Sequence, residues 1–170
     1  VTDPAQVIQS DVEAVFVCTP NHQIPELTVQ CLDRGKHVFC EKPPGRTLKD
    51  IKRMQEAERQ NPGTKLMFGF NHRYHPGVLR AKSIVASGRL GEIVSMRGLY
   101  GKSGGKNFSH SWRNDYKISG GGILLDQGIH MLDLFNYFIG GFTSSKAFMS
   151  NGHWGFNVED NAVVILKNDE

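Results

Sequence analysis

Two short apolar runs decide the fold: Glu13-Ala-Val-Phe-Val-Cys18, which leads into Thr19-Pro20-Asn21, and His37-Val-Phe-Cys40, which leads into Glu41-Lys42-Pro43. Continuous apolar runs of this length, closed by turn residues, are typical of strands in a parallel sheet that is covered on both faces. Residues 23–34 between them have the apolar spacing of a helix. This stretch therefore predicts a strand–helix–strand unit with parallel strands.

The same pattern continues as far as residue 70. Thr47 is a good N-cap for a helix that ends at Asn61, and residues 65–70 form a third apolar run. After residue 72 the pattern changes. It predicts a helix over 76–87, a half-exposed strand over 93–100, a long loop over 101–122, a helix over about 122–139 and antiparallel strands over 145–149 and 158–166.

Composition excludes several classes of protein. Of the 170 residues, 39% are apolar and 22% are charged, which is typical of a globular domain and argues against disorder. No apolar stretch is long enough to span a membrane and no secretory signal is visible, so we expect a cytoplasmic protein. The net charge of +3 comes from scattered residues, which argues against nucleic acid as a ligand.

The sequence has an odd number of cysteines, Cys18, Cys31 and Cys40, and no two of them form a CxxC motif. This pattern argues against a disulfide framework and a zinc site, and we expect reduced, buried thiols.

A dinucleotide-binding domain normally begins with a strand, a G-x-G-x-x-G turn and, about 20 positions on, an acidic residue. The sequence contains none of these before Glu13, where we expect only a loop. Two explanations remain: the strands serve another purpose, or the sequence belongs to a longer protein. The blunt end at Asn168-Asp169-Glu170 favours the second.

Polar residues follow the first two predicted strands, at the sheet edge where parallel α/β proteins bind ligands. Thr19-Pro20-Asn21 ends the first strand, and Asn21 could bind a ribose or an amide; alternatively, the segment is a plain turn. Pro43 favours an extended Lys42 that points away from the ladder. Lys42 could stabilise a developing alkoxide, or it could be an ordinary solvated lysine.

The Gly-rich segment over residues 120–134 carries the most chemical information. Three glycines precede a predicted helix on which Asp126 and His130 are spaced i,i+4 and share a face with Asp133. Buried polar groups are costly unless they are paired, so the pair could be functional or could simply satisfy itself in the core. The spacing also resembles half of a metal site, but no third ligand is evident and we expect no metal.

Two further segments are ambiguous. Arg113 could clamp an anion and Trp112 could stack on a sugar, or both could merely anchor the long loop. The polar groups of Asn71-His72-Arg73-Tyr74 could line a cleft or brace the junction between the two parts of the chain.

Taken together, the order and spacing of these motifs resemble the Gfo/Idh/MocA oxidoreductases, which include glucose–fructose oxidoreductase, inositol dehydrogenases and sugar-nucleotide dehydrogenases. The resemblance runs from about Asp11 to Leu166. It implies an α/β plus α+β fold: the C-terminal part of a Rossmann-like parallel sheet (1–72), lacking its first βαβ unit, followed by a partial, mostly antiparallel open-sheet domain (73–170).

The resemblance also implies roles for individual residues. Lys42 resembles the family lysine that touches both the substrate hydroxyl and the nicotinamide ribose, His130 the acid/base, and Asp126 the carboxylate that orients substrate or assists His130. The implied cofactor contacts are Thr19, Pro20, Asn21, Glu41 and Lys42; the implied substrate contacts are Arg73, Trp112, Arg113, Asp126 and His130.

The implied reaction is hydride transfer between NAD or NADP and a carbinol carbon of a sugar, polyol or sugar nucleotide. The residues meet the chemical requirements of this reaction, because an imidazole can take up the hydroxyl proton and a fixed cation can stabilise the developing oxyanion. Three alternatives stay open: an NAD-dependent glycoside hydrolase of the same fold, a non-catalytic truncated relative and, least favoured, a metal-dependent enzyme that uses Asp126 and His130. We also expect a dimer or tetramer formed through the C-terminal sheet.

Three structural and functional expectations follow. Lys42, Asp126 and His130 should converge on one cleft. The resemblance suggests a cis peptide at Lys42-Pro43. The 170 residues alone should bind the cofactor no better than millimolar, because the pyrophosphate-binding turn is not among them.

Overall fold

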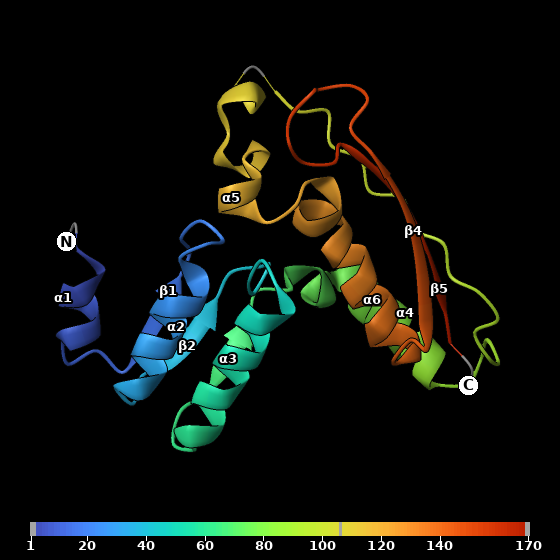
Figure 1. The fold of residues 1–170 in the computed structure, drawn as a ribbon. Helices are drawn as coiled ribbons and strands as arrows, with labels where there is room; N and C mark the ends of the chain where they lie inside the picture. The colour runs from blue at the N-terminus through green and yellow to red at the C-terminus, as the bar shows by residue number, and fades with distance from the viewer. Residues whose placement is uncertain (1–2, 106, 169–170) are drawn as a thin grey trace. The chain divides into compact units, whose positions relative to one another are not determined.

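The computed structural model describes residues 3–105 and 107–168, which form two compact units (Figure 1). The first consists of the chain up to Gly69 together with Ser111–Gly122, and the second of Phe70–His110 together with the residues from Ile123 on. Residues 111–122 pack with the first unit. The division into domains at residue 72 stays a prediction.

The first unit is built on a parallel sheet of strands β1 (Ala14–Val17), β2 (His37–Cys40) and β3 (Leu66–Phe68), in that order. Val15 pairs with Val38, and Cys40 with Phe68. Helices α2 (Ile24–Asp33) and α3 (Leu48–Gln60) connect the strands, as predicted.

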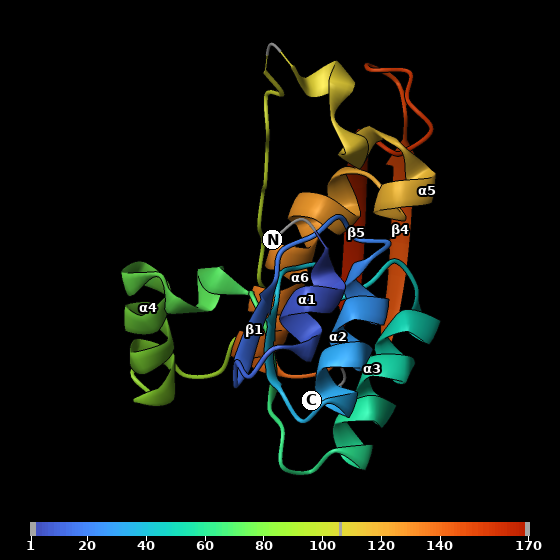
Figure 2. The same ribbon diagram turned by 90° about the vertical axis from the view of Figure 1, so that its left-hand side faces the viewer.

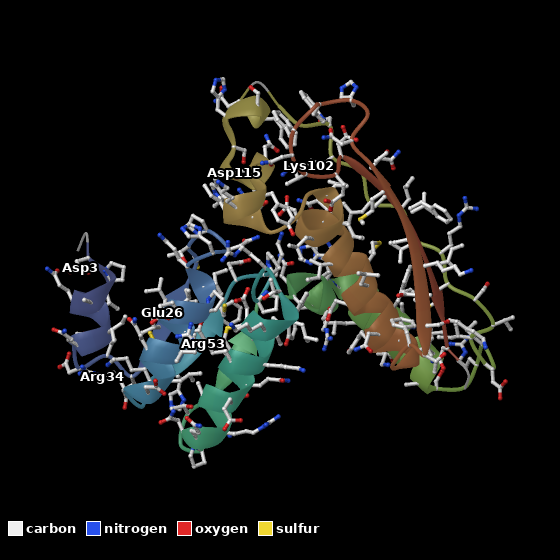
Figure 3. The ribbon with its side chains drawn as sticks, in the orientation of Figure 1. Asp3, Glu26, Arg34, Arg53, Lys102 and Asp115 are labelled. Atoms are coloured by element: carbon white, nitrogen blue, oxygen red, sulfur yellow. The ribbon has the colours of Figure 1, made fainter. Side chains whose placement is uncertain are left out.

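Helices α2 and α3 pack side by side in both views of the fold (Figures 1 and 2). Their apolar faces meet the sheet in a core that contains Ile24, Leu32, Val38, Cys40 and Met54. On α3, Arg53 donates to Glu26 of α2 at 2.5 Å, and this hydrogen bond lowers the pKa of Glu26 (Figure 3). The opposite face of the sheet is open among the described residues, since Phe16 is 71% exposed.

A short helix, α1 (Pro4–Gln9), occupies the segment before Glu13 that was expected to be a loop. Its N-cap is Asp3, whose side chain accepts the Ala5 N–H at 2.9 Å, and Pro4 stands at the first helical position. Asp followed by Pro is a helix-start signal, but six residues are too few to show a helical period. The helix contributes Ile8 to the core.

The start of α3 confirms Thr47 as its N-cap. Thr47 and Asp50 form a reciprocal capping box, in which Thr47 Oγ1 accepts the Asp50 N–H and Asp50 Oδ2 accepts the Thr47 N–H. The same Oδ2 atom accepts the Arg46 N–H at 2.9 Å. The helix start therefore also fixes the backbone of the residue before it.

The second unit combines helices with a hairpin. After the 3₁₀ turn η1 (Asn71–Tyr74) come α4 (Pro76–Ala86), the π-helical turn η4 (Leu124–Gly128) and α6 (Ile129–Ile139). Strands β4 (Ser144–Ser150) and β5 (Asn161–Lys167) pair antiparallel, which confirms the prediction of two antiparallel strands.

Two predictions in the second unit are corrected. Residues 93–100 form no strand: their alternation is compatible with one, but no edge among the described residues pairs with them, and Val94 and Leu99 are each 96% exposed. The predicted continuous helix over 122–139 begins instead as the π-helical turn η4, so the α-helical spacing assumed for Asp126 and His130 does not apply at Asp126.

The predicted long loop over 101–122 contains three short helical segments: η2 (Phe108–His110), η3 (Trp112–Asn114) and α5 (Tyr116–Ser119). The first belongs to the second unit, and the other two belong to the first unit.

All three thiols are free, but only Cys31 and Cys40 are buried, and Cys18 is exposed, which corrects the expectation for Cys18. Burial raises the pKa of Cys40 to about 12, so this thiol stays protonated at neutral pH. No helix in the described part of the chain is both long and apolar enough to cross a bilayer.

The loop between β4 and β5 is organised by Asp160. Its carboxylate accepts the N–H groups of His153 and Trp154, each at 2.8 Å, and of Gly152 at 3.2 Å. These hydrogen bonds, led by that of Trp154, lower the pKa of Asp160. The Trp154 ring lies 4.9 Å from that of Phe108.

A carboxyl with a depressed pKa in the folded state stabilises that state above its unfolded pKa of about 3.9, and this stability is lost as the pH falls through the folded pKa. We therefore expect Trp154 fluorescence to change below about pH 4, reported in a Trp112→Phe background. In Asp160→Asn, Trp154 should show already at neutral pH the fluorescence that the unsubstituted loop shows only in acid, and this fluorescence should not change further below about pH 4. An unchanged Asp160→Asn spectrum would contradict this account of the loop.

Candidate functional site

The first unit places three predicted cofactor contacts directly after β1. The Oγ1 atom of Thr19 is buried and has no hydrogen-bond partner among the described residues, and Pro20 is half-buried. Asn21 is 5% exposed, and its Nδ2 donates to the carbonyl of Ser119 at 2.8 Å. Thr19 therefore has a side-chain hydroxyl to offer a ligand, whereas the Asn21 amide nitrogen is used within the chain.

The residues after β2 lie at the same edge of the sheet. The Glu41 N–H donates to the Val17 carbonyl, which extends the ladder, and the Glu41 carboxylate accepts the Lys42 N–H at 3.1 Å. Lys42 is half-buried. The Lys42-Pro43 peptide is cis, as the family resemblance suggested.

Trp112 and Arg113 lie on η3, within the part of the long loop that packs with the first unit. The Arg113 guanidinium lies 4.4 Å from the centroid of the Trp112 ring, and the Ser111 hydroxyl accepts the Arg113 N–H. This distance is within the range of a cation–π interaction between the two side chains.

In the second unit, His130 lies on α6 and is only 4% exposed. Its ring stacks on that of His72 with centroids 3.9 Å apart. Tyr100 lies 6.2 Å away, and Phe70 meets the ring edge-on at 6.3 Å. His130 is thus a buried imidazole whose orientation is fixed by flat rings from residues 70, 72 and 100.

Asp126 lies on η4, immediately before α6, and its side chain is 18% exposed. Its Oδ2 accepts Gln127 Nε2 at 2.9 Å and lies 3.7 Å from Lys102 Nζ (Lys102 is labelled in Figure 3). A hollow of about 420 Å³ beside Lys102 is also lined by Ser103, His153 and Trp154. This volume lies within the range of small-molecule pockets.

The Arg73 guanidinium is held by Asp133 of α6. Nε donates to Asp133 Oδ2 at 2.7 Å and Nη2 to Oδ1 at 2.5 Å, while the guanidinium carbon lies 5.2 Å from the Tyr137 ring centroid. The hydrogen bonds to Asp133 raise the pKa of Arg73. Because the fork is occupied, the guanidinium links η1 to α6 within the second unit, and the assignment of Arg73 to the substrate stays a prediction.

The structure thus groups the predicted residues by unit. The first unit holds Thr19, Pro20, Asn21, Glu41, Lys42, Trp112 and Arg113; the second holds Arg73, Asp126 and His130. The convergence of Lys42 with Asp126 and His130 involves both units and stays a prediction.

Sequence reasoning missed His72, Tyr100 and Lys102 as neighbours of the acid/base candidates. His72 stood in a quoted motif, but nothing in its spacing points to His130. Within residues 3–105 and 107–168, no three His, Cys, Asp or Glu side chains are grouped so that they could hold a metal ion.

Comparison with known proteins identifies the class to which this arrangement belongs. Residues 1–70 match the oxidoreductase family with the NAD-binding Rossmann fold, and residues 78–170 match the GFO/IDH/MocA C-terminal domain. The chain therefore belongs to the GFO/IDH/MocA oxidoreductase family.

Among curated relatives, the chain is 36% identical over 142 residues to levoglucosan dehydrogenase of Pseudarthrobacter phenanthrenivorans, covering 82% of this chain and 36% of that protein. It is 36% identical to D-glucoside 3-dehydrogenase of Escherichia coli (81% and 39% covered) and 34% identical to myo-inositol 2-dehydrogenase of Thermotoga maritima (81% and 40%). The chain thus spans well under half the length of these relatives.

Solved structures agree on the fold. Levoglucosan dehydrogenase in complex with NADH and levoglucosan superposes with a TM-score of 0.90 at 32% identity, covering 98% of this chain and 47% of that one. Myo-inositol 2-dehydrogenase from Lactobacillus plantarum gives a TM-score of 0.86 at 28% identity, covering 98% and 51%.

Proposed function

We propose that the protein carrying this chain is an NAD(P)-dependent dehydrogenase that oxidises a hydroxyl carbon of a cyclic sugar or polyol. The observation that carries the proposal is His130: a buried imidazole, fixed by stacked rings, in a chain of an NAD-binding oxidoreductase family. The related enzymes are named for levoglucosan, a glucoside and inositol, all cyclic polyols, which supports this substrate class.

The residues after β1 and β2 fit a nicotinamide cofactor. The buried Thr19 hydroxyl lacks a partner among the described residues, and it stands at the carboxyl ends of parallel strands, where such ligands bind. A nicotinamide cofactor held by these residues would supply the hydride acceptor for the carbinol carbon. We assign Thr19 and Pro20 to the cofactor and Lys42 to both the cofactor ribose and the reacting hydroxyl, as the family resemblance implies.

The second unit would move the proton. As the carbinol is oxidised, its hydroxyl proton passes to an imidazole nitrogen of His130, because imidazole is the side chain best suited to exchanging a proton near neutral pH. The Asp126 carboxylate accepts a hydrogen bond from a sugar hydroxyl and so orients the substrate. The nearby ammonium of Lys102 balances the charge of this carboxylate. Trp112 and Arg113 contact the sugar from the first unit.

Replacing Lys42 with Met tests the proposal, because it removes the ammonium group while keeping the aliphatic stem. In the protein that carries this chain, we expect kcat/KM for the preferred polyol to fall by about 10²–10³-fold, the effect of removing one preorganised donor at a developing oxyanion. Formation of NADH or NADPH is followed by absorbance with a panel of cyclic polyols.

The matched control is Lys49→Met on α3, an exposed lysine of the same unit, which should leave turnover unchanged. Full activity of Lys42→Met, or no formation of either NADH or NADPH with any cyclic polyol, would contradict the proposed function.

We further propose that the protein forms a homo-oligomer through the outer face of the β4–β5 hairpin. Phe148 pairs with Val163 across the ladder, and with Ile165 they place three apolar side chains on one face, 59–70% exposed.

Phe148→Lys should reduce the mass seen by sedimentation to that of one chain. Ser145→Lys, on the opposite face of β4, should not; equal masses for both variants would refute this interface.

A further inference from the structure

Residues 111–122 are fastened to the first unit by two side chains that come from distant parts of the sequence. The first is Asn21, whose Nδ2 donates to the Ser119 carbonyl 98 positions away. Both residues are buried, with 5% and 2% exposure. An amide buried in this way has replaced its hydrogen bond to water by one to the chain, and removing it would leave the Ser119 carbonyl unsatisfied.

The second is Arg46, which donates from Nη1 to the Lys117 carbonyl, 71 positions away. Its backbone N–H is itself held by Asp50, the residue that completes the capping box of α3. Gly120 lies directly against it: a Cβ at Gly120 would stand 2.4 Å from Arg46 Cβ, and its φ of +81° is in the left-handed region. The contact therefore requires glycine at position 120 for both space and backbone conformation.

The fastened segment is also connected by its own hydrogen bonds. Asp115 (labelled in Figure 3) caps α5 by accepting the Lys117 N–H at 2.9 Å, and its carbonyl accepts the Ser119 hydroxyl at 2.9 Å. The Asp115 N–H donates in turn to the Trp112 carbonyl at 3.2 Å. These hydrogen bonds connect Ser119 through Asp115 to Trp112, so we expect a displacement at Ser119 to reach the Trp112–Arg113 pair.

We propose that Asn21 and Arg46 are positioning residues that set the place of Trp112 and Arg113 for the sugar, and that Asn21 acts on substrate binding rather than as a direct cofactor contact. The proposal rests on the proposed function, in which Trp112 and Arg113 contact the sugar. It assigns the turn after β1 a second task besides cofactor binding, and it gives Arg46 a role where none was expected.

The test uses Asn21→Leu, which keeps the side-chain size but removes the donor, and Arg46→Met, with Arg46→Lys as the conservative variant that retains one donor. Amide hydrogen exchange of residues 115–120 reports the fastening without any need for activity. Calorimetry gives the Kd for NADH, and steady-state kinetics give the KM for the sugar, all in the protein that carries this chain.

We expect exchange at residues 115–120 to accelerate by about tenfold in Asn21→Leu and Arg46→Met, as for the loss of one buried hydrogen bond. The sugar KM should rise by about tenfold, the NADH Kd should stay within about twofold, and Arg46→Lys should recover part of the loss. The exposed residues Gln23 and Arg59 supply the controls, Gln23→Leu and Arg59→Met, which should change none of the three quantities.

A rise in the NADH Kd of Asn21→Leu without faster exchange would overturn the proposal and make Asn21 a cofactor contact. Faster exchange with an unchanged sugar KM would also overturn it. Trp112→Leu and Arg113→Met separate this from failure of the proposed function: if they raise the sugar KM, the sugar contacts stand and only the positioning role falls; if they do not, the sugar contacts themselves are wrong.

Discussion

Replacing His130 with Gln is expected to lower kcat for polyol oxidation by about 10²–10⁴-fold, the usual contribution of a general base. Gln keeps a polar side chain of similar reach but cannot take up a proton. The Kd for NADH should be unchanged, because His130 is assigned to the substrate proton and lies in the second unit, whereas Thr19 and Lys42 lie in the first.

His110→Gln is the matched control, since His110 is an exposed histidine of the same unit. It should retain full turnover. If His130→Gln kept more than about a tenth of wild-type kcat, well outside the range for a lost general base, the acid/base assignment would be wrong. A loss of kcat accompanied by a lower unfolding temperature would point instead to disruption of the stack with His72.

Much of the first unit could be predicted because its signals are local. Apolar runs closed by Pro or Gly marked β1 and β2, and Thr47 with Asp50 carried both halves of a capping box within four residues. The β4–β5 hairpin was also predictable, since its alternation is matched by a pairing edge that the chain itself supplies. In each case the residues that decide the structure are near neighbours in sequence or repeat with a clear period.

What the sequence did not show depends on distant partners. Residues 93–100 alternate as a strand does, yet a strand also needs an edge to pair with, which alternation cannot reveal. The residues of the π-helical turn at Asp126 are equally compatible with an α-helix. The sequence therefore could not show that the spacing between Asp126 and His130 departs from that of an α-helix. His72, 58 positions before His130, and Asn21, 98 before Ser119, meet their partners only through the tertiary fold.

The Arg73–Asp133 pair provides the second large expected effect, on stability rather than on turnover. Its two members differ in exposure: the Asp133 side chain is 8% exposed and that of Arg73 is 35%. Removing Arg73 leaves a buried carboxylate without its two charge-assisted hydrogen bonds, whereas removing the charge of Asp133 leaves a cation that water can still reach. Arg73→Met should therefore destabilise the protein by about 3 kcal/mol, and Asp133→Asn by only about 1–2 kcal/mol.

Urea unfolding measures the loss of stability in both variants, and the dependence of the unfolding free energy on urea concentration should stay unchanged. Arg59→Met is the control, because the Arg59–Glu56 pair is exposed at both members and should contribute less than about 0.5 kcal/mol. Equal losses for Arg73→Met and Asp133→Asn would contradict the burial argument. The double variant Arg73→Met/Asp133→Leu should recover most of the stability lost in Arg73→Met, because it removes the stranded carboxylate, and apolar replacement of both members of an ion pair is often nearly neutral. If it does not, the pair is needed for its geometry, as a fixed link between η1 and α6 that orients His72 against His130.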